Sequence, residues 1–310
     1  MSTMCAGERL TCNTRPQILR EPRPLGAVLG LCAAVIWGSY LALAKAGVNA
    51  GLGSSDIALL RYGVAGLLML PWLITHGPSN LGGVGWRRGA ILTLLAGPLF
   101  VLIGVGGYKF SPLAHGAMFQ PAGLILGGIA LAALVFHERS PAQRLIGIII
   151  MLLGLAFLAG PGLFSTTSLT PIGDAMFFSA GMMWAGFSIL AKRWSISPLA
   201  ATAAVSVLSA LIYVPVHFVV FGWQQLLSSP IAMLTIQVLV QGVLSGVVAV
   251  IAFAKAIQLI GPARAAIFPA FVPAAALIIG IPITGEVPTL LQIGGLSLVT
   301  VGLLLAIVSR

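Results

Sequence analysis

The acidic residues and histidines of this 310-residue chain are too few and too scattered to form a catalytic cluster. A membrane-bound prenyl or acyl transferase would need paired carboxylates, or a histidine beside an aspartate. The ionisable residues that could contribute are Glu8, Glu21, Asp56, Glu138, Asp174, Glu286, His76, His115, His137 and His217. Cys5, Cys12 and Cys32 are an odd set without metal-ligand spacing. We therefore expect a protein that is not an enzyme, with no catalytic residues, metal site or cofactor.

Polar side chains recur at helical spacing inside several long apolar segments. Gln237, Gln241 and Ser245 are four residues apart and would form one stripe on a helix. Lipid offers no hydrogen-bond partner, so we interpret this stripe as facing a cavity. Gln120 lies roughly 12 Å into its segment, where substrate contact and an interhelical hydrogen bond are equally open. His115 lies about 140° around the same helix from Gln120, and an interfacial role is favoured for it.

The basic residues inside or beside the apolar segments are Lys45, Arg61, Lys109 and Lys255. Each lies within about two turns of a predicted helix end, so we favour a structural or anchoring role over substrate binding for each of them. The acidic residues fall in the tail, in loops or at helix ends, and none lies deep in a predicted helix. An exporter of cationic drugs normally needs a buried carboxylate. Basic charge within the membrane instead favours a substrate that bears a carboxylate, helped by helix N-termini.

Composition places nearly the whole chain in a membrane. The residues are 59% hydrophobic and 7% charged, with a mean hydropathy of +1.08, whereas soluble domains carry about 25% charged residues. Apolar stretches long enough to cross a hydrocarbon layer follow one another, often headed by proline, which suits the first turn of a helix. The predicted spans are 24–46, 56–74, 89–107, 112–135, 141–159, 171–191, 198–220, 230–254, 262–281 and 288–308.

The distribution of basic residues sets the predicted orientation of these ten helices. Lysine and arginine accumulate in cytoplasmic loops. With the tail, residues 1–23, inside the cell, all but three of the sixteen basic residues fall on the inner side, the exceptions being Lys45, Arg61 and Lys109. Both termini are therefore predicted to be cytoplasmic, and the net charge of +10 reflects topology rather than binding to nucleic acid.

The chain contains an internal repeat. The segment from Trp37 to Lys45 resembles the segment from Trp184 to Lys192, 147 residues later. Landmarks 148 residues apart continue the match and are Pro121 with Pro269, Glu138 with Glu286, and Gly147 with Gly295. Five helices in each half make the second half enter the membrane from the opposite face. We therefore predict an all-α membrane protein with two inverted five-helix repeats, residues 24–160 and 171–310, as in many secondary transporters.

The repeat also aligns aromatic residues and glutamates. Trp37 and Tyr40 occupy the positions of Trp184 and Phe187, where lining of a shared cavity and core packing or an interfacial belt are equally open. Glu138 and Glu286 fall in loops on opposite faces. We expect each glutamate to cap the helix that follows it.

The sequence resembles the EamA-type drug/metabolite transporters over nearly its whole length after the tail. The resemblance is carried by Trp37-Gly38, Lys45, Arg61 and the stretch from Tyr108 through Pro121 to Glu138 and Gly147, and in the second half by Trp184, Lys192, Pro269, Glu286 and Gly295. The second half lacks an equivalent of Arg61. Within the family the chain is most similar to bacterial inner-membrane exporters of amino acids and related metabolites. This implies ten helices around a central cavity and transport without a metal or organic cofactor, but names no substrate.

Together these observations predict a secondary transporter, not driven by ATP, that exports small zwitterionic or anionic metabolites, amino acids above all, by alternating access. The candidate cavity residues are Trp37, Tyr40, Tyr108, His115, Gln120, Trp184, Phe187, Gln237, Gln241 and Ser245. The alternatives are a proton-coupled multidrug exporter and, less favoured, an integral-membrane enzyme. We expect the bacterial inner membrane as the location, a small metabolite and the lipid bilayer as partners, no nucleic acid, and a monomer, with the oligomeric state open.

Overall fold

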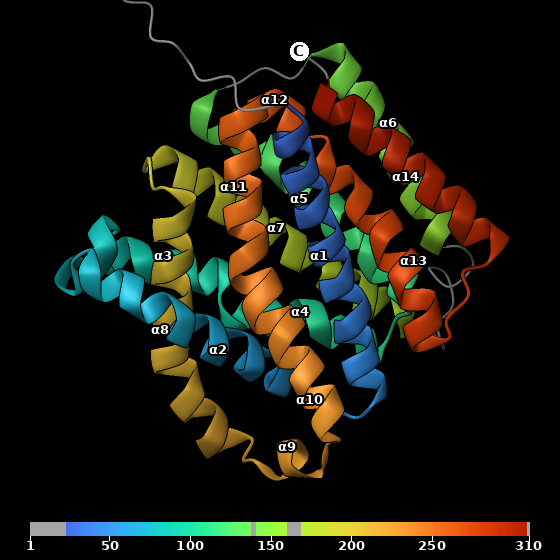
Figure 1. Cartoon of the computed structure of the whole chain (residues 1–310). Helices are drawn as coiled ribbons and strands as arrows, with labels where there is room; N and C mark the ends of the chain where they lie inside the picture. The colour runs from blue at the N-terminus through green and yellow to red at the C-terminus, as the bar shows by residue number, and fades with distance from the viewer. Residues whose placement is uncertain (1–22, 138–140, 160–168, 309–310) are drawn as a thin grey trace, which may run out of the picture.

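The computed structural model describes residues 23–137, 141–159 and 169–308, and the described residues form helices joined by short turns and loops (Figure 1). In the first half, α1 spans Arg23–Asn49, α2 Ser54–Thr75, α5 Leu113–Phe136 and α6 Ala142–Ala159. The third span is divided into α3, Trp86–Ala96, and α4, Pro98–Gly106. Short 3₁₀ turns, η1 at Pro78–Gly83 and η2 at Gly107–Lys109, lie at its two ends.

In the second half, α7 spans Thr170–Arg193, α8 Pro198–Val220 and α14 Leu290–Val308. The eighth span is continuous through α10, Ile231–Gln237, the π-helical segment η4, Val238–Val248, and α11, Ala249–Ile260. The ninth contains α12, Pro262–Ala265, the 3₁₀ turn η5, Phe268–Phe271, and α13, Val272–Thr284. The short helix α9, Gln224–Ser228, lies in the loop before α10.

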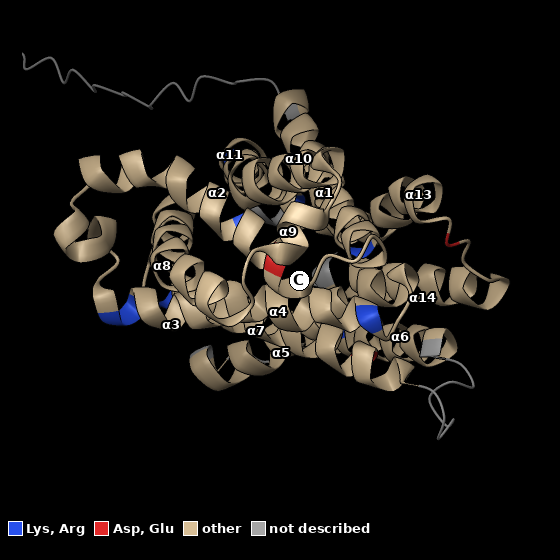
Figure 2. Ribbon diagram, turned by 90° about the horizontal axis from the view of Figure 1, so that it is seen from below, with Lys and Arg blue, Asp and Glu red and all other residues tan. Residues whose placement is uncertain are grey.

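These elements provide the ten predicted spans, five in each half. Seven helices are long and apolar enough to cross a membrane, and three shorter apolar helices, Ala142–Leu158, Phe268–Thr284 and Leu290–Ala306, supply the others. Figure 2, viewed from the end where α9 lies, shows how few charged residues occur among the helices. This end corresponds to the side predicted to be extracytoplasmic and is called the outer side below, and the opposite end is called the inner side.

Three spans differ in detail from the prediction. The third is interrupted because Gly97 has an extended backbone and Pro98 has no N–H to continue the helix. The eighth continues beyond the predicted end at residue 254, so Lys255 lies on an exposed face of α11 rather than in a loop. The ninth, predicted as one helix, is broken around η5, which contains Pro269, the counterpart of Pro121. Pro121 itself lies inside the unbroken α5.

Helix contacts follow the same pattern in both halves. Helix α5 packs against α7, and their counterparts α13 and α1 pack in the same way. Helices α2 and α8, which are counterparts of each other, also pack together, as do α6 and α14 (Figure 1). The pattern is therefore preserved when the two halves are exchanged. This is the packing expected of duplicated halves related by a two-fold axis, and it is consistent with the proposed inversion.

Four glycines bring the backbones of α6 and α14 into contact. Gly147 lies against Gly302, and Gly154 lies against Gly295. A Cβ atom on Gly302 would lie 2.6 Å from both the Gly147 carbonyl oxygen and the Met151 backbone nitrogen. Backbone atoms cannot move aside as a flexible side chain can. Helices in lipid often associate through small residues in this way, because close packing replaces the missing hydrophobic driving force.

We predict that Gly302→Ala destabilises the protein by about 1–3 kcal/mol, the usual cost of overpacking a close contact. Gly294→Ala is the matched control, because Gly294 is exposed on the same helix and a Cβ there meets no atom within 4 Å. Thermal unfolding in detergent measures the effect, with a lower Tm expected for Gly302→Ala alone. Equal Tm values for the two variants would show that this contact does not limit stability.

Candidate functional site

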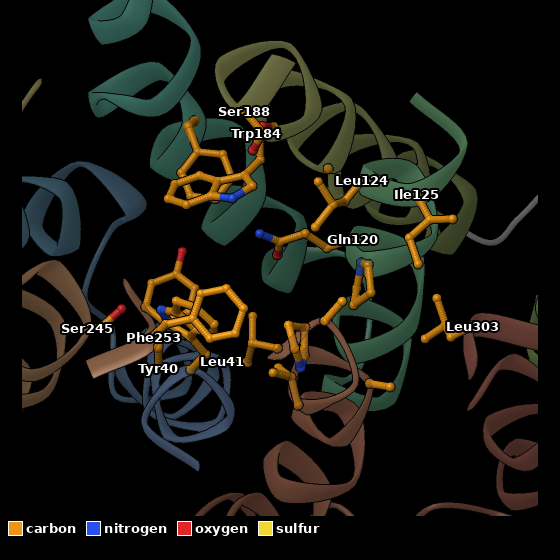
Figure 3. A pocket seen from close by; sticks show the side chains of 18 of the residues that line it. Tyr40, Leu41, Gln120, Leu124, Ile125, Trp184, Ser188, Ser245, Phe253 and Leu303 are labelled. Carbon is orange, nitrogen blue, oxygen red and sulfur yellow. The ribbon is translucent and has the colours of Figure 1, made fainter. Parts of the chain in front are cut away.

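A cavity of about 400 Å³ lies between the two halves (Figure 3). Both halves contribute to its wall, through α1, α2, α4, α5 and α7 and through η4, α11, η5, α13 and α14. The residues from α7, α11 and η5 belong to the inner halves of their spans, whereas those from α1 and α5 lie near the middle. Its size falls within the range of about 300–1,000 Å³ common for small-molecule sites. The cavity can therefore hold a metabolite-sized ligand.

Equivalent residues of the repeat meet at this cavity. Trp37 on α1 and Trp184 on α7 both line it, as do Pro121 on α5 and Pro269 in η5. Trp37 contacts Phe253 edge to face at 5.3 Å between ring centroids, and Trp184 packs against Phe100 at 5.2 Å. The two halves thus supply similar aromatic walls to one shared space.

Arg61, on α2, is the charged residue of the cavity wall. Arg61 is only 6% exposed, and its Nη1 donates a hydrogen bond to Ser245 Oγ at 3.0 Å. The guanidinium carbon lies 4.8 Å from the centre of the Tyr40 ring and 5.6 Å from that of Tyr62. The buried Nε has no hydrogen-bond partner among the described residues. Within the described part of the chain, no carboxylate forms an ion pair with this guanidinium.

An anchoring role at the interface does not fit Arg61 or Lys45, whereas a structural role fits Lys45, which pairs with Glu286. Both residues are buried, whereas Lys109 and Lys255 are exposed. Sequence reasoning therefore missed Arg61 as a cavity residue. A signal was present, because Arg61 has no counterpart in the second half, as expected of a residue whose role belongs to one half alone.

The predicted cavity residues separate into two groups. Those that line the cavity are Trp37, Tyr40, Gln120, Trp184 and Ser245. In Figure 3, Gln120 points into the space between Trp184 and Tyr40. Those that the structure places elsewhere are Tyr108, His115, Phe187, Gln237 and Gln241. None of this second group lines this cavity.

Two residues of this second group, Gln237 and Gln241, hold helices together. Gln237 Nε2 donates to the Leu43 carbonyl at 2.6 Å, and Gln241 Nε2 donates to the Tyr40 carbonyl at 3.2 Å. Both bonds join the eighth span to α1. Only Ser245 of the predicted stripe reaches the cavity, because the face of this span that carries the glutamines packs against a neighbouring backbone. Phe187 lines a smaller adjacent space of about 30 Å³ that Arg61 also borders.

Tyr108 and His115 lie nearer the outer side. Tyr108 is buried and packs against Phe177, with 4.8 Å between ring centroids. His115 lies near the outer end of α5, as expected, but it is buried, with Nδ1 2.8 Å from Asp174 Oδ1. Asp174 stands in the first turns of α7, near a helix end as the sequence indicated, but it is buried and also accepts a hydrogen bond from Ser111 Oγ at 3.2 Å.

Three pairs of ionisable side chains, one lysine–glutamate and two histidine–aspartate, join the two halves at the outer side. Lys45 Nζ lies 3.1 Å from Glu286 Oε1, and the His115 ring faces Asp174 as described. The third pair is His217 Nε2 with Asp56 Oδ1, at 3.4 Å but without hydrogen-bond geometry. Each pair takes one residue from the first half and one from the second. We call these three pairs the outer seal, because separating the halves at this side would require breaking them.

Glu286 also caps a helix, although not the one predicted. Its Oε2 accepts a hydrogen bond from the Leu113 N–H at 2.7 Å, at the start of α5 rather than α14. The carboxylate thus satisfies an N-terminal donor of the first half while it pairs with Lys45. Lys45 Nζ further donates to the carbonyls of Tyr108 and Ser111, at 3.1 and 3.3 Å. The capping role predicted for Glu138 concerns a position outside the described residues.

Comparison with known families agrees with this architecture. The model of the EamA-like transporter family matches the chain twice, over residues 24–160 and 171–308. The chain belongs to the EamA-like transporter family. It is therefore an integral membrane transporter of the drug/metabolite class and not an enzyme. The two matched segments correspond to the two five-helix halves of this EamA-like transporter.

Solved structures support the same fold. Sixteen chains of known structure match, among them a crystal structure described simply as that of a protein. It superposes with a TM-score of 0.63 at 16% sequence identity, covering 92% of this EamA-like transporter and 97% of the other chain. At this identity the likeness concerns the fold alone. No curated protein matches the sequence.

We predict that Lys45→Met opens the cavity to the outer side, because Glu286 then loses the cation that holds it between the halves. A cysteine-free variant carrying Leu124→Cys in the cavity wall reports the opening, through labelling by a membrane-impermeant thiol reagent added to the outer face. Labelling should become about fivefold faster, the change that about 1 kcal/mol on the opening equilibrium produces.

Lys109→Met is the matched control for this measurement, since it removes the same charge from an exposed position near the same side. It should leave the labelling rate unchanged. Equal rates for the two variants would show that the Lys45–Glu286 pair does not keep the outer side closed.

Proposed function

We propose that this EamA-like transporter moves a small metabolite bearing a carboxylate, zwitterionic or anionic, across the bacterial inner membrane by alternating access. The observation that carries the proposal is the buried Arg61 guanidinium in the cavity wall, without a carboxylate partner among the described residues. An uncompensated charge in a low-dielectric site is costly, and an anionic ligand would remove that cost. Arginine also offers a planar set of donors that matches a carboxylate.

Alternating access is supported by the arrangement of the outer seal and the cavity. The cavity lies between the halves, at the middle and inner levels of the spans, while the three pairs of the outer seal join the outer ends. Transport would then require these pairs to separate as the inner side closes. Amino acids are the first metabolites to test. Export as the direction rests on the resemblance to exporters.

A proton-coupled multidrug exporter is the alternative function. The buried acids Asp56 and Asp174 lie beside histidines and could bind protons. They belong to the outer seal, however, and the described cavity wall has no carboxylate that an organic cation could bind. This favours a carboxylate-bearing substrate.

Flux into liposomes tests the proposal. Purified protein should carry out saturable exchange of some members of a panel of amino acids and other small carboxylates. Arg61→Gln should lower this flux by at least about tenfold, since a hydrogen-bonded charge contributes about 1.5–3 kcal/mol. Arg87→Gln, at an exposed position on α3, is the control and should retain the flux. Transport of organic cations without transport of carboxylates would contradict the proposal.

A proton gradient across the same liposomes distinguishes the modes of transport. A carboxylate flux that ignores the gradient indicates facilitated diffusion, whereas a flux driven by it indicates coupling to protons. Arg61→Gln should lower the flux under both conditions, because the guanidinium is expected to bind the substrate in either mode.

A further inference from the structure

The charges around the cavity differ from those that a zwitterion requires. Arg61 supplies a single positive charge, and the described lining residues include no aspartate or glutamate. The buried acids in the described part of the chain, Asp56 and Asp174, face His217 and His115 instead. They belong to α2 and α7 at the outer side, apart from the cavity wall. The cavity wall thus carries one uncompensated positive charge.

The neighbours of Arg61 lower the free-energy cost of burying its charge without neutralising that charge. Ser245 accepts one hydrogen bond, and the Tyr40 ring offers its electron-rich face at 4.8 Å. Nε remains without a partner. Gln120, the other large polar side chain of the wall, forms no side-chain hydrogen bond with described residues and points into the cavity (Figure 3). The guanidinium can therefore exchange its weak contacts for a carboxylate, with Gln120 as an additional donor or acceptor.

The rest of the wall is apolar and largely aromatic. The aromatic residues form two pairs, Trp37 with Phe253 and Phe100 with Trp184, and each pair contains one residue from each half. All four rings line the same cavity. Aromatic walls bury an apolar body favourably and stack against a ring. Such a surface offers no hydrogen-bond acceptors to replace the water molecules that an ammonium group loses when it is buried. A cation above an aromatic face gains some attraction, but here the same cavity already holds the Arg61 charge.

We infer that the cargo of this cavity is a net monoanion with a compact, ring-bearing apolar body, and that zwitterions of the same shape are disfavoured. The inference rests on the proposed function, because it assigns the carboxylate to Arg61. It adds that an α-ammonium group would be buried without a counter-charge, which is costly in a low-dielectric site. Between the two substrate types that the sequence left open, the cavity selects the anion.

Three compounds that share one ring and differ in charge test this inference, namely 3-phenylpropionate, phenylalanine and phenethylamine. Binding to the purified protein is followed through quenching of the fluorescence of Trp37 and Trp184, and transport through liposome flux at neutral pH. The anion should bind at least about tenfold more tightly than the zwitterion, a difference of about 1.4 kcal/mol. Phenethylamine should not compete. Arg61→Gln should remove the preference for the anion.

Gln120→Glu supplies the missing negative charge at nearly the same volume. It should raise the affinity for phenylalanine relative to 3-phenylpropionate by about tenfold or more, through the new partner for the ammonium group. Gln258→Glu, on an exposed position of α11, is the matched control and should leave the ratio unchanged. An unchanged ratio in Gln120→Glu would contradict the assigned charge balance.

The outcomes separate this inference from the proposed function. Equal or tighter binding of phenylalanine, still dependent on Arg61, would overturn the preference for an anion and leave a carboxylate transporter in place. If none of the three compounds binds, the inference that the cargo has a ring-bearing body is overturned, while the wider panel of carboxylates continues to test the proposed function. Binding of phenethylamine alone would overturn both.

Discussion

In a hydrocarbon layer, a polar group that finds no partner in the protein finds none at all, and this constraint shapes every part of the molecule. It requires helices, whose backbone donors and acceptors are paired within each segment. It also explains why buried glutamines donate to the α1 backbone and why the buried acids Asp174 and Asp56 face histidines. Against this background, Arg61 stands out. It is a buried charge whose described partners are a hydroxyl and aromatic rings.

The two halves are alike in packing but not in chemistry. Exchange of the halves preserves the helix pairs, the glycine contacts between α6 and α14, and the tryptophans of the cavity. Such symmetry allows two conformations of similar energy that open to opposite sides. Arg61 has no counterpart, so both conformations would offer the same single cation to the substrate. Under the proposed function, the repeat would permit the movement between these conformations, and Arg61, which departs from the repeat, would recognise the substrate.

Weak compensation of Arg61 also suits transport. A strong ion pair within the protein would exclude the substrate, whereas a guanidinium with no partners would be too costly to bury. Ser245 and Tyr40 give Arg61 intermediate contacts, which the proposed carboxylate substrate would displace on binding and which would form again after its release. At the outer side the balance differs, because Lys45 has Glu286 and two carbonyls as partners. Stronger pairing there is appropriate to a closed contact between the halves.

The sequence by itself determined the class of protein, the ten spans and the duplicated halves, because hydrophobic length and internal repetition are properties of the chain read in order. It also pointed to Trp37, Trp184 and Gln120, which line the cavity. Only the tertiary structure decided which face of each span meets the cavity. These helices are apolar nearly all round, so their rotation depends on neighbouring helices rather than on their own pattern. Hence Ser245 reaches the cavity while Gln241, one turn earlier, bonds to α1, and Asp56 finds His217 far along the chain.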